Sequence, residues 1–205
     1  MSMLYSVVGG KPLTDGGANV AALRLIKTPV DGCNVIFTEQ YKDDRGYFSE
    51  SFNQEDYLKV GLPVVWPQDN VSNSNEWVLR GLHIQRKRPQ GKLVRCIKGS
   101  VWDVCLDLRP ESPTFMKWHG QLLNGGASMY CPAGTAHGFL AMVPRSIVYY
   151  KCTTLYDKDS DGGISPLDPE LKIPWPIGGT MIMSEKDKGL PTMKQWLEDP
   201  RGIYE

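Results

Sequence analysis

Hydrophobic and polar residues alternate in short runs along this chain, and the runs are rich in β-branched and aromatic side chains. The sequence contains 21 glycines and 15 prolines, which separate these runs. No long stretch keeps the 3.6-residue apolar period of an amphipathic helix. Period-two alternation between frequent turn residues is typical of strands. The pattern therefore predicts a mainly β protein.

The clearest predicted strand pair covers residues 92–108. The run KLVRCI is followed by Lys98-Gly99-Ser100 and then by VWDVCLDL. A short connection with a central glycine is typical of a β-hairpin, so we expect these two runs to pair. Alternation in the second run places on one face Trp102, Val104, Leu106 and Leu108, and on the other Val101, Asp103, Cys105 and Asp107. A face that carries two carboxylates is not a simple hydrophobic core.

Further runs have strand patterns, and their spacing favours a sandwich or a barrel. They are Asn34 to Thr38, Tyr47 to Phe52, Lys117 to Leu123, Ser128 to Cys131, His137 to Met142 and Ile147 to Thr154. Short helices are expected at Asn53 to Leu58 and Thr192 to Leu197. The proline-rich segment 156–179 is expected to form a long loop packed across the domain surface.

Composition excludes several classes of protein. The 205 residues suffice for one domain with a substantial core. Lysine plus arginine equals aspartate plus glutamate at 23 each, so no global positive field attracts nucleic acid or an anionic membrane. No window approaches a membrane-spanning apolar run, and we expect a soluble, cytoplasmic protein. Scattered cysteines without CxxC pairs argue against a disulfide framework and a zinc site, and we expect reduced core residues at Cys33, Cys96, Cys105, Cys131 and Cys152.

Candidate chemistry begins in the run VLRGLHIQ, Val78 to Gln85. The chain has only three histidines, which makes His83 the leading candidate for a general base. Arg80 supplies a fixed positive charge whose planar fork suits a phosphate or a carboxylate. The pair therefore indicates proton chemistry on an anionic substrate.

A second histidine follows the turn Pro-x-Gly-x-x-His, Pro132 to His137, as in the second motif of cupin barrels. A metal-binding cupin also needs an earlier His-x-His, and the matching place here offers only His83, Ile84 and Gln85. The sequence therefore argues against a metal. Taken alone, His137 is as much a structural as a substrate-contacting candidate. Simple ion pairing or solvation is the common alternative role for Arg45, Arg80, Lys92, Lys186 and Asp187.

Eight motifs occur in an order that resembles the deoxythymidine-diphosphate-4-dehydrorhamnose (dTDP-4-dehydrorhamnose) 3,5-epimerase family, whose members are metal-free cupin-type jelly rolls. They are DRGYFSESFN from Asp44, QDN from Gln68, VLRGLH from Val78, QGKLVR from Gln90, DLRPESPTF from Asp107, PAGTAHGF from Pro132, YYK from Tyr149 and SEKD from Ser184. The resemblance spans roughly residues 34–197. It implies a single jelly-roll β-barrel domain over residues 34–205, with residues 1–33 as an extra arm or strand.

The resemblance implies epimerisation of a nucleotide-linked 4-keto-6-deoxyhexose at C3 and C5. On this pattern His83 is the base, Asp187 orients and stabilises its imidazole, Tyr150 is the acid on the opposite sugar face, and Lys92 stabilises the enolate. The positions implied for substrate binding are Arg45, Glu50, Gln68, Asp69, Asn70, Arg80, His137, Asp161 and Lys186. Arg45 and Glu50 match an arm that reaches the nucleotide across a dimer interface, so we expect a homodimer. No cofactor is implied.

Departures from the family pattern leave the substrate open. Val71 stands where histidine is usual, Asp161 replaces a glutamate, and Leu155 and Leu167 occupy places that are often aromatic. The main alternative is an epimerase of one centre only, or of a CDP- or GDP-linked keto sugar. A silent sugar-nucleotide binding module or small-ligand sensor is an alternative of another class, and a metal-dependent cupin oxygenase is a third. The combination of His83, Asp187 and Tyr150 favours double epimerisation.

Overall fold

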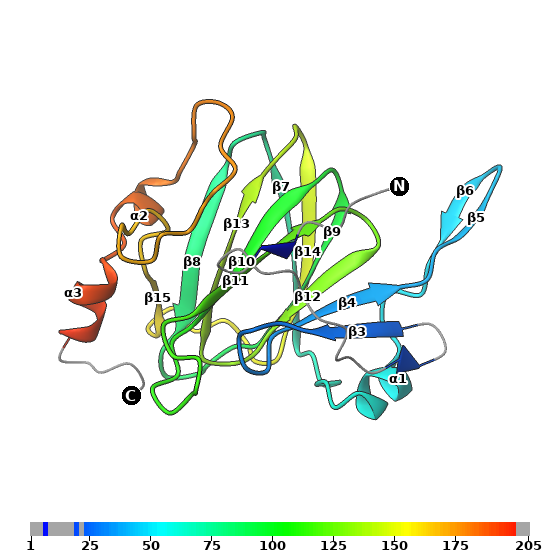
Figure 1. Ribbon diagram of the computed structural model, residues 1–205, viewed down its shortest axis with the longest axis horizontal. Coiled ribbons are helices and arrows are strands. Elements are labelled where there is room, and N and C mark those ends of the chain that lie inside the picture. Colours follow the sequence, from blue (N-terminus) through cyan, green and yellow to red (C-terminus); the bar gives the residue numbers. More distant parts are fainter. Residues whose placement is uncertain (1–5, 8–18, 21–22, 200–205) are drawn as a thin grey trace.

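Two antiparallel sheets dominate the computed structural model, which describes residues 6–7, 19–20 and 23–199 (Figure 1). The six-stranded sheet has the order β1 (Ser6–Val7), β11 (Trp118–Leu123), β10 (Val101–Asp107), β13 (Thr135–Ala141), β8 (Leu79–Gln85) and β15 (Asp161–Gly163). The seven-stranded sheet has the order β2 (Asn19–Val20), β3 (Leu23–Lys27), β4 (Asn34–Thr38), β12 (Ala127–Cys131), β9 (Lys92–Lys98), β14 (Ser146–Cys152) and β7 (Gln68–Ser74). A separate hairpin, β5 (Tyr41–Asp43) and β6 (Gly46–Phe48), projects away from both sheets.

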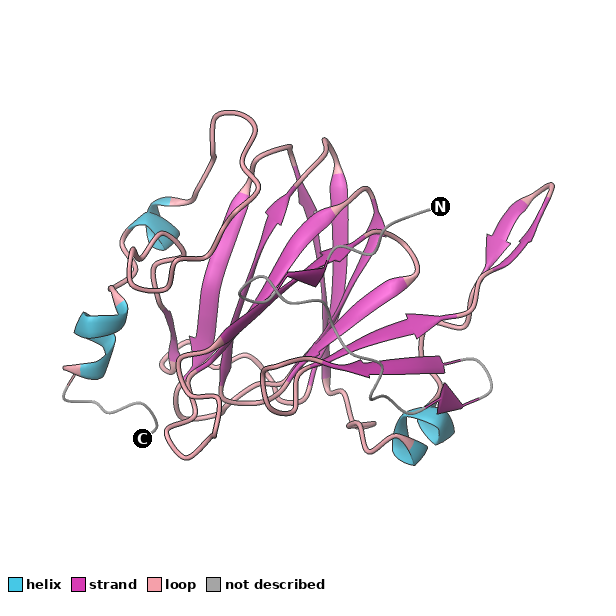
Figure 2. Ribbon diagram, viewed as in Figure 1, coloured by secondary structure: helices cyan, strands magenta, loops and turns pink. Residues whose placement is uncertain are grey.

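The chain crosses repeatedly from one sheet to the other. Strands β8, β9 and β10 alternate between the sheets, and β12, β13 and β14 do so again. This alternation is typical of a jelly roll. The prediction of a mainly β jelly roll with a few short helices is therefore confirmed (Figure 2).

The predicted hairpin at residues 92–108 is wrong. Strand β9 pairs with β12 and β14, whereas β10 pairs with β11 and β13 in the other sheet. Gly99, at φ +82°, lies between them, and a Cβ added there would lie 2.9 Å from the Cα of Ser146. The short connection is therefore a corner between sheets. Alternation within the second run was predicted correctly, because residues 102, 104 and 106 pack in one hydrophobic cluster and residues 101 and 105 in another.

Most other strand predictions are confirmed to within a few residues, as the bounds of β4, β11, β12, β13 and β14 show. The predicted strand Tyr47 to Phe52 is too long, since β6 ends at Phe48. Within the predicted loop at residues 156–179, β15 adds a short strand beside β8. Of the predicted N-terminal arm, β3 pairs with β4, and residues 1–5, 8–18 and 21–22 lie outside the described part. The domain division at residue 34 stays a prediction.

Both expected helices are present, and each begins directly after a polar N-cap residue. The Asn53 side chain accepts hydrogen bonds from two backbone N–H groups at the start of α1 (Gln54–Lys59). Thr192 and Gln195 form a capping box at the start of α3 (Met193–Leu197). A third helix, α2 (Glu185–Lys188), was not predicted; its cap is Ser184. In the described part of the chain, no helix is long and apolar enough to cross a membrane.

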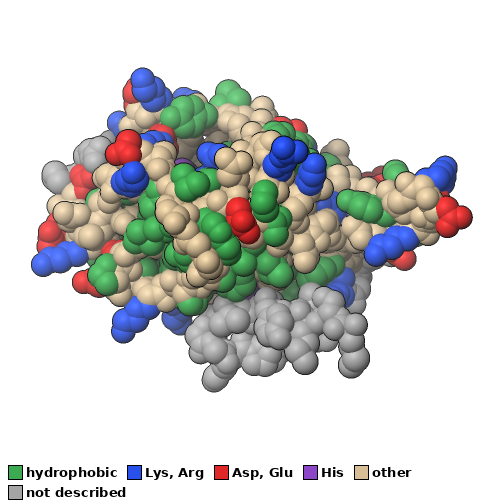
Figure 3. Space-filling model, turned by 90° about the horizontal axis from the view of Figure 1, so that it is seen from above, with side chains coloured by type: hydrophobic (Ala, Val, Ile, Leu, Met, Phe, Trp, Pro, Cys, Tyr) green, Lys and Arg blue, Asp and Glu red, His purple; other side chains and the backbone are tan. Residues whose placement is uncertain are grey.

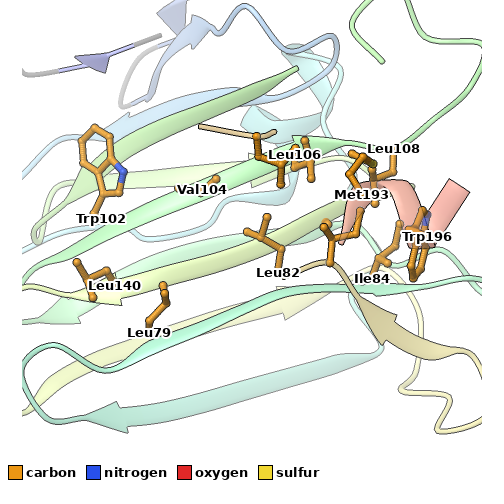
Figure 4. Close-up of a cluster of buried hydrophobic side chains, with 13 residues drawn as sticks. Leu79, Leu82, Ile84, Trp102, Val104, Leu106, Leu108, Leu140, Met193 and Trp196 are labelled. Carbon is orange, nitrogen blue, oxygen red and sulfur yellow. The ribbon is translucent and has the colours of Figure 1, made fainter. Parts of the chain in front are cut away.

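Three hydrophobic clusters hold the sheets and their coverings together. The cluster between the sheets includes Val94, Cys96, Met129, Phe139 and Val148. A second cluster, on the outer face of the six-stranded sheet, joins side chains of β8, β10 and β13 to the C-terminal segment (Figure 4). A third cluster packs α1 and the following loop against the outer face of the seven-stranded sheet. All five cysteines are free and buried, as expected of core residues.

Trp196 is the largest fully buried side chain of the second cluster. It is 2% exposed, and the guanidinium carbon of Arg86 lies 3.4 Å from the centroid of its ring. We expect Trp196→Ala to lower the free energy of unfolding by about 3–5 kcal/mol, because it removes this burial and leaves a cavity. The measurement is urea-induced unfolding followed by circular dichroism.

Leu197 is the matched control for this prediction, because it is the next residue of the same helix and is 44% exposed. Leu197→Ala should change the free energy of unfolding by no more than about 0.5 kcal/mol. Equal losses in the two variants would show that the C-terminal segment is not anchored by burial of Trp196.

Candidate active site

A bulge between β8 and β13 places Arg80 and His83 on the same face of the sheet. Arg80 pairs with Phe139 and His83 with His137, so two residues of β8 oppose one residue of β13. In a regular strand, residues three apart point to opposite faces. Because directly paired residues share a face, Arg80 and His83 both point into the space between the sheets, where Phe139 is buried.

Glycine is required on both strands at the bulge. A Cβ at Gly81, which has φ +107°, would lie 2.6 Å from the Cα of Gly138. A Cβ at Gly138 would lie 2.5 Å from the carbonyl oxygen of Arg80. The glycine noted between the arginine and the histidine in the sequence therefore permits the backbone contact on which their orientation depends.

Asp187 is held against His83 by the short helix α2. Its Oδ1 lies 2.6 Å from Nε2 of His83, and its Oδ2 accepts a hydrogen bond from the Gly81 backbone N–H at 3.4 Å. The Ser184 hydroxyl caps the helix by accepting the N–H of Asp187. Burial alone would raise the pKa of Asp187, but the contact with His83 and these donors hold its pKa below the ordinary value. The carboxylate is therefore ionised and orients the imidazole.

His137 has a buried carboxylate partner of its own. Its Nε2 lies 2.7 Å from Oδ1 of Asp103, and the two residues come from the paired strands β13 and β10. Burial raises the pKa of Asp103, an effect that the charge and hydrogen bond of His137 oppose. Sequence reasoning did not name Asp103 as a site residue. The sequence feature that could have identified Asp103 is its position as a carboxylate on a strand face whose apolar residues suit the core.

Tyr150 and Lys92 face the two histidines from the seven-stranded sheet. They lie on β14 and β9, and the rings of Tyr150 and His137 have centroids 6.4 Å apart. Burial raises the pKa of the Tyr150 phenol, so it stays protonated at neutral pH. Burial lowers the pKa of Lys92, and no described residue forms a hydrogen bond or an ion pair with its ammonium group. The structure thus places His83 and Tyr150 on opposite walls of this space.

Polar side chains of β7, β15 and α2 lie beside the strands that carry His83 and Tyr150. Lys186 of α2 forms an ion pair with Asp161 of β15, and the Tyr156 hydroxyl donates to Asp161 at 2.9 Å. Gln68 accepts the backbone N–H of Tyr156 at 2.6 Å and donates to Asn70 at 3.1 Å. Figure 3 shows a recess on the face seen from above, in which a histidine side chain is visible among lysine and arginine side chains.

Not every predicted site residue reaches this space. Asp69 alternates with Gln68 and Asn70 on β7 and points to the outer face, where it accepts hydrogen bonds from Tyr149 and Lys151. Its predicted contact with substrate inside the barrel therefore has no support in this chain's own geometry. Arg45 and Glu50 lie on or beside the projecting β5–β6 hairpin, outside the barrel of their own chain (Figure 1).

Comparison with known proteins gives these residues a context. The family model described as dTDP-4-dehydrorhamnose 3,5-epimerase matches residues 27–195. A protein of that name from Methanothermobacter thermautotrophicus is 46% identical over 180 residues, which is 86% of this chain and 97% of the relative. A protein named dTDP-4-dehydrorhamnose 3-epimerase, from Streptomyces niveus, is 36% identical over 170 residues and covers 81% of this chain and 82% of its own length.

The fold comparison agrees. A crystal structure from Legionella pneumophila superposes with a TM-score of 0.81 at 39% identity, covering 84% of this chain and 93% of that one. It is described as a dTDP-6-deoxy-D-glucose-3,5-epimerase in complex with dTDP-4-keto-L-rhamnose. Family model, sequence relatives and solved fold lead to one conclusion: the chain belongs to the dTDP-4-dehydrorhamnose 3,5-epimerase family.

Proposed function

We propose that this protein epimerises dTDP-4-dehydro-6-deoxyglucose at C3 and C5 to give dTDP-4-dehydrorhamnose. The observation that carries the proposal is the His83–Asp187 pair, 2.6 Å apart, on the wall opposite Tyr150 and Lys92. Inversion beside a carbonyl requires a group that removes a proton from one face and a group that returns one to the other. The family to which the chain belongs supports the nucleotide and the sugar.

His83 begins each inversion by removing the proton from the carbon next to the C4 carbonyl. Asp187 accepts a hydrogen bond at Nε2, which holds the ring in place and stabilises the imidazolium that forms. In the described structure no residue forms a hydrogen bond with Nδ1 of His83, and we assign the proton transfer to this nitrogen. The base thus has a fixed orientation before the substrate binds.

Lys92 stabilises the negative charge that develops on the C4 oxygen. Its ammonium group is buried and has no carboxylate partner among the described residues, so its charge is directed at a bound substrate. In a buried site such a preorganised charge acts more strongly than it would in water. Tyr150 then donates its proton to the opposite face of the enolate. The raised pKa of the phenol keeps this proton available at neutral pH.

Substrate binding is assigned to the residues around these four. Arg80 uses Nε to contact Ser74 and has no carboxylate partner among the described residues, so its remaining N–H groups are available for the diphosphate. We assign His137, Gln68 and Asn70 to the sugar. Lys186 is already paired with Asp161, and it has to exchange that partner in order to contact a phosphate.

The β5–β6 hairpin supports a homodimer in which each subunit completes the partner's site. It projects from the barrel (Figure 1), and it carries Tyr47 and Phe48, which are 55% and 69% exposed. Exposed aromatic side chains on a projecting arm are typical of an interface. We therefore assign Arg45 and Glu50 to the nucleotide bound by the second subunit. Buried free cysteines suit a reducing compartment, and we propose a cytoplasmic location.

A 3-epimerase is the second candidate, because the relative from Streptomyces niveus carries that name. Both activities need a base, an acid and an enolate-stabilising charge on the same sugar. The residues of this chain that we place around the substrate serve either one. The number of exchanging carbons separates them.

Proton exchange in deuterated water tests the proposed function directly. We expect the protein to catalyse deuterium incorporation at both C3 and C5 of dTDP-4-dehydro-6-deoxyglucose, because each inversion passes through an enolate. Proton NMR measures the incorporation at each carbon. Exchange should continue with a chelator present. Exchange at C3 alone would establish the 3-epimerase, and no exchange at either carbon would contradict the proposal.

Two single variants separate the base from the acid. His83→Ala should slow exchange at both carbons by about 10²–10⁴-fold, because no other group removes the protons. Tyr150→Phe should slow product formation by a similar factor but retain exchange, since His83 can return a solvent deuteron to the face from which it took the proton. The measurement compares exchange with product formation for each variant by NMR.

Tyr149→Phe is the matched control, because Tyr149 precedes Tyr150 on β14 and points to the outer face, where it donates to Asp69 at 2.7 Å. This variant should keep both exchange and product formation. If Tyr150→Phe and His83→Ala lose exchange equally, the assignment of base and acid is wrong.

Mixing two inactive subunits tests the shared site. Arg45→Ala and His83→Ala homodimers should each have low turnover, but a heterodimer has one site with an intact His83 and an intact partner arm. Random reassortment therefore recovers about a quarter of the wild-type activity. Turnover is measured after the two variants are mixed under conditions that exchange subunits. Lack of recovery despite heterodimer formation would show that Arg45 does not act across the interface.

A further inference from the structure

Three side chains with metal-binding atoms meet at the inner end of the site. Asp103 of β10, Cys131 of β12 and His137 of β13 are all buried, and their ligand atoms lie within 4.8 Å of one another. Cys131 comes from the seven-stranded sheet and the other two from the six-stranded sheet. The group therefore joins the two walls, and His137 connects it to the space that we assign to the substrate.

One carboxylate oxygen in this group lacks a protein partner. Oδ1 of Asp103 contacts His137, but Oδ2 is buried and no described residue donates a hydrogen bond to it. A buried carboxylate oxygen without a donor is unfavourable, because it has lost its hydration without gaining a hydrogen bond. A cation bound at Oδ2 would satisfy it.

Ligand chemistry and net charge indicate which cation fits. Zinc binds carboxylate oxygen, imidazole nitrogen and thiolate sulfur at about 2.0–2.3 Å, in tetrahedral geometry. Two such ligands are therefore roughly 3–4 Å apart, which the separations in this group can reach with small side-chain movements. With Asp103 and Cys131 deprotonated and His137 neutral, the two negative charges balance a divalent cation. A neutral cluster avoids the high cost of a net charge in the interior.

A competing set shares Cys131. The sulfurs of Cys33, Cys105 and Cys131 also lie within 4.8 Å of one another. Three thiolates around a divalent cation carry a net negative charge, and these sulfurs lie in the hydrophobic cluster between the sheets. Charge balance therefore favours the mixed set of Asp103, Cys131 and His137 over the three cysteines.

We propose that Asp103, Cys131 and His137 form a binding site for a thiophilic divalent cation such as Zn²⁺, and that its occupancy inhibits the enzyme. The cation reaches the site through the substrate space. It binds Nε2 of His137 and so replaces the hydrogen bond between this nitrogen and Asp103. It also turns the ring away from its present position opposite Tyr150 and adds positive charge beside the substrate. This inhibitory site goes beyond the proposed epimerase activity.

Cobalt binding tests the site without reference to activity. Co²⁺ added to the full-length protein should produce a sulfur-to-cobalt charge-transfer band and the visible bands of a tetrahedral ion, and Zn²⁺ should remove both. Cys131→Ser should weaken cobalt binding by at least about 100-fold, because it removes a direct ligand. Cys33→Ser should retain the bands. Cys96→Ser is the matched control, since the Cys96 thiol contacts the carbonyl of Lys98 and belongs to neither set.

Each outcome decides the proposal. Bands that are lost in Cys131→Ser and kept in Cys33→Ser and Cys96→Ser support the mixed site. Equal loss in Cys33→Ser and Cys131→Ser would assign the cation to the three cysteines and overturn the proposal. Absence of a sulfur-to-cobalt band in the wild type would also overturn it. None of these readings depends on whether the protein is an epimerase.

Inhibition is measured separately. Zn²⁺ should lower wild-type turnover, a chelator should restore it, and the Zn²⁺ concentration for half inhibition should rise by at least about 100-fold in Cys131→Ser. Cys96→Ser should be inhibited like the wild type. Cobalt binding at the mixed site without Zn²⁺ inhibition would overturn the inhibitory role and leave a site of another purpose.

Discussion

The backbone contact between Gly81 and Gly138 determines how the rest of the site is arranged. Only residues without a Cβ allow β8 and β13 to approach there, and the resulting bulge turns Arg80 and His83 toward the same interior. Gly81 also donates its backbone N–H to Asp187. One local irregularity in an otherwise regular sheet thus orients the imidazole of His83, the guanidinium of Arg80 and the carboxylate of Asp187 that contacts His83.

Burial divides the chemical roles among the site residues. Tyr150, which stays neutral, and Lys92, which has no ion-pair partner among the described residues, lie on the seven-stranded sheet. The histidines of the six-stranded sheet that face them, His83 and His137, each contact a carboxylate. Exclusion of water raises the pKa of the phenol and lowers the pKa of the ammonium group. The same exclusion strengthens each charge that acts on a substrate. The barrel interior therefore shifts the pKa values of these groups through its dielectric environment as well as through its geometry.

Local pattern predicted the strands well, because alternation and turn residues are properties of short segments. It failed where the outcome depends on distant partners. Residues 92–108 have the pattern of a hairpin, yet both edges of β9 and β10 pair with strands elsewhere in the chain. Alternation alone would also have placed Arg80 and His83 on opposite faces, because the bulge is visible only once β13 is opposite.

The site shows the same division between local and distant information. Sequence resemblance named His83 and Asp187, and the structure brings them into contact although 104 residues separate them. Asp103 was noticed as an acid on a core-like strand, but its partner could not be identified from spacing. Asp69 was assigned with its neighbours in the QDN motif, and strand alternation turns it outward. A motif specifies residue types, whereas pairing decides which of them face the interior.

The C-terminal segment has two structural roles, and both begin when it docks on the sheet. It covers the outer face of the six-stranded sheet, and it carries Asp187 to His83. During synthesis, β8 leaves the ribosome about a hundred residues before Asp187, so His83 of a growing chain is without its carboxylate partner. The contact between His83 and Asp187 therefore forms only when the last part of the domain docks. This contact is thus a marker of the completed fold, because a chain that has not closed its outer layer does not have it.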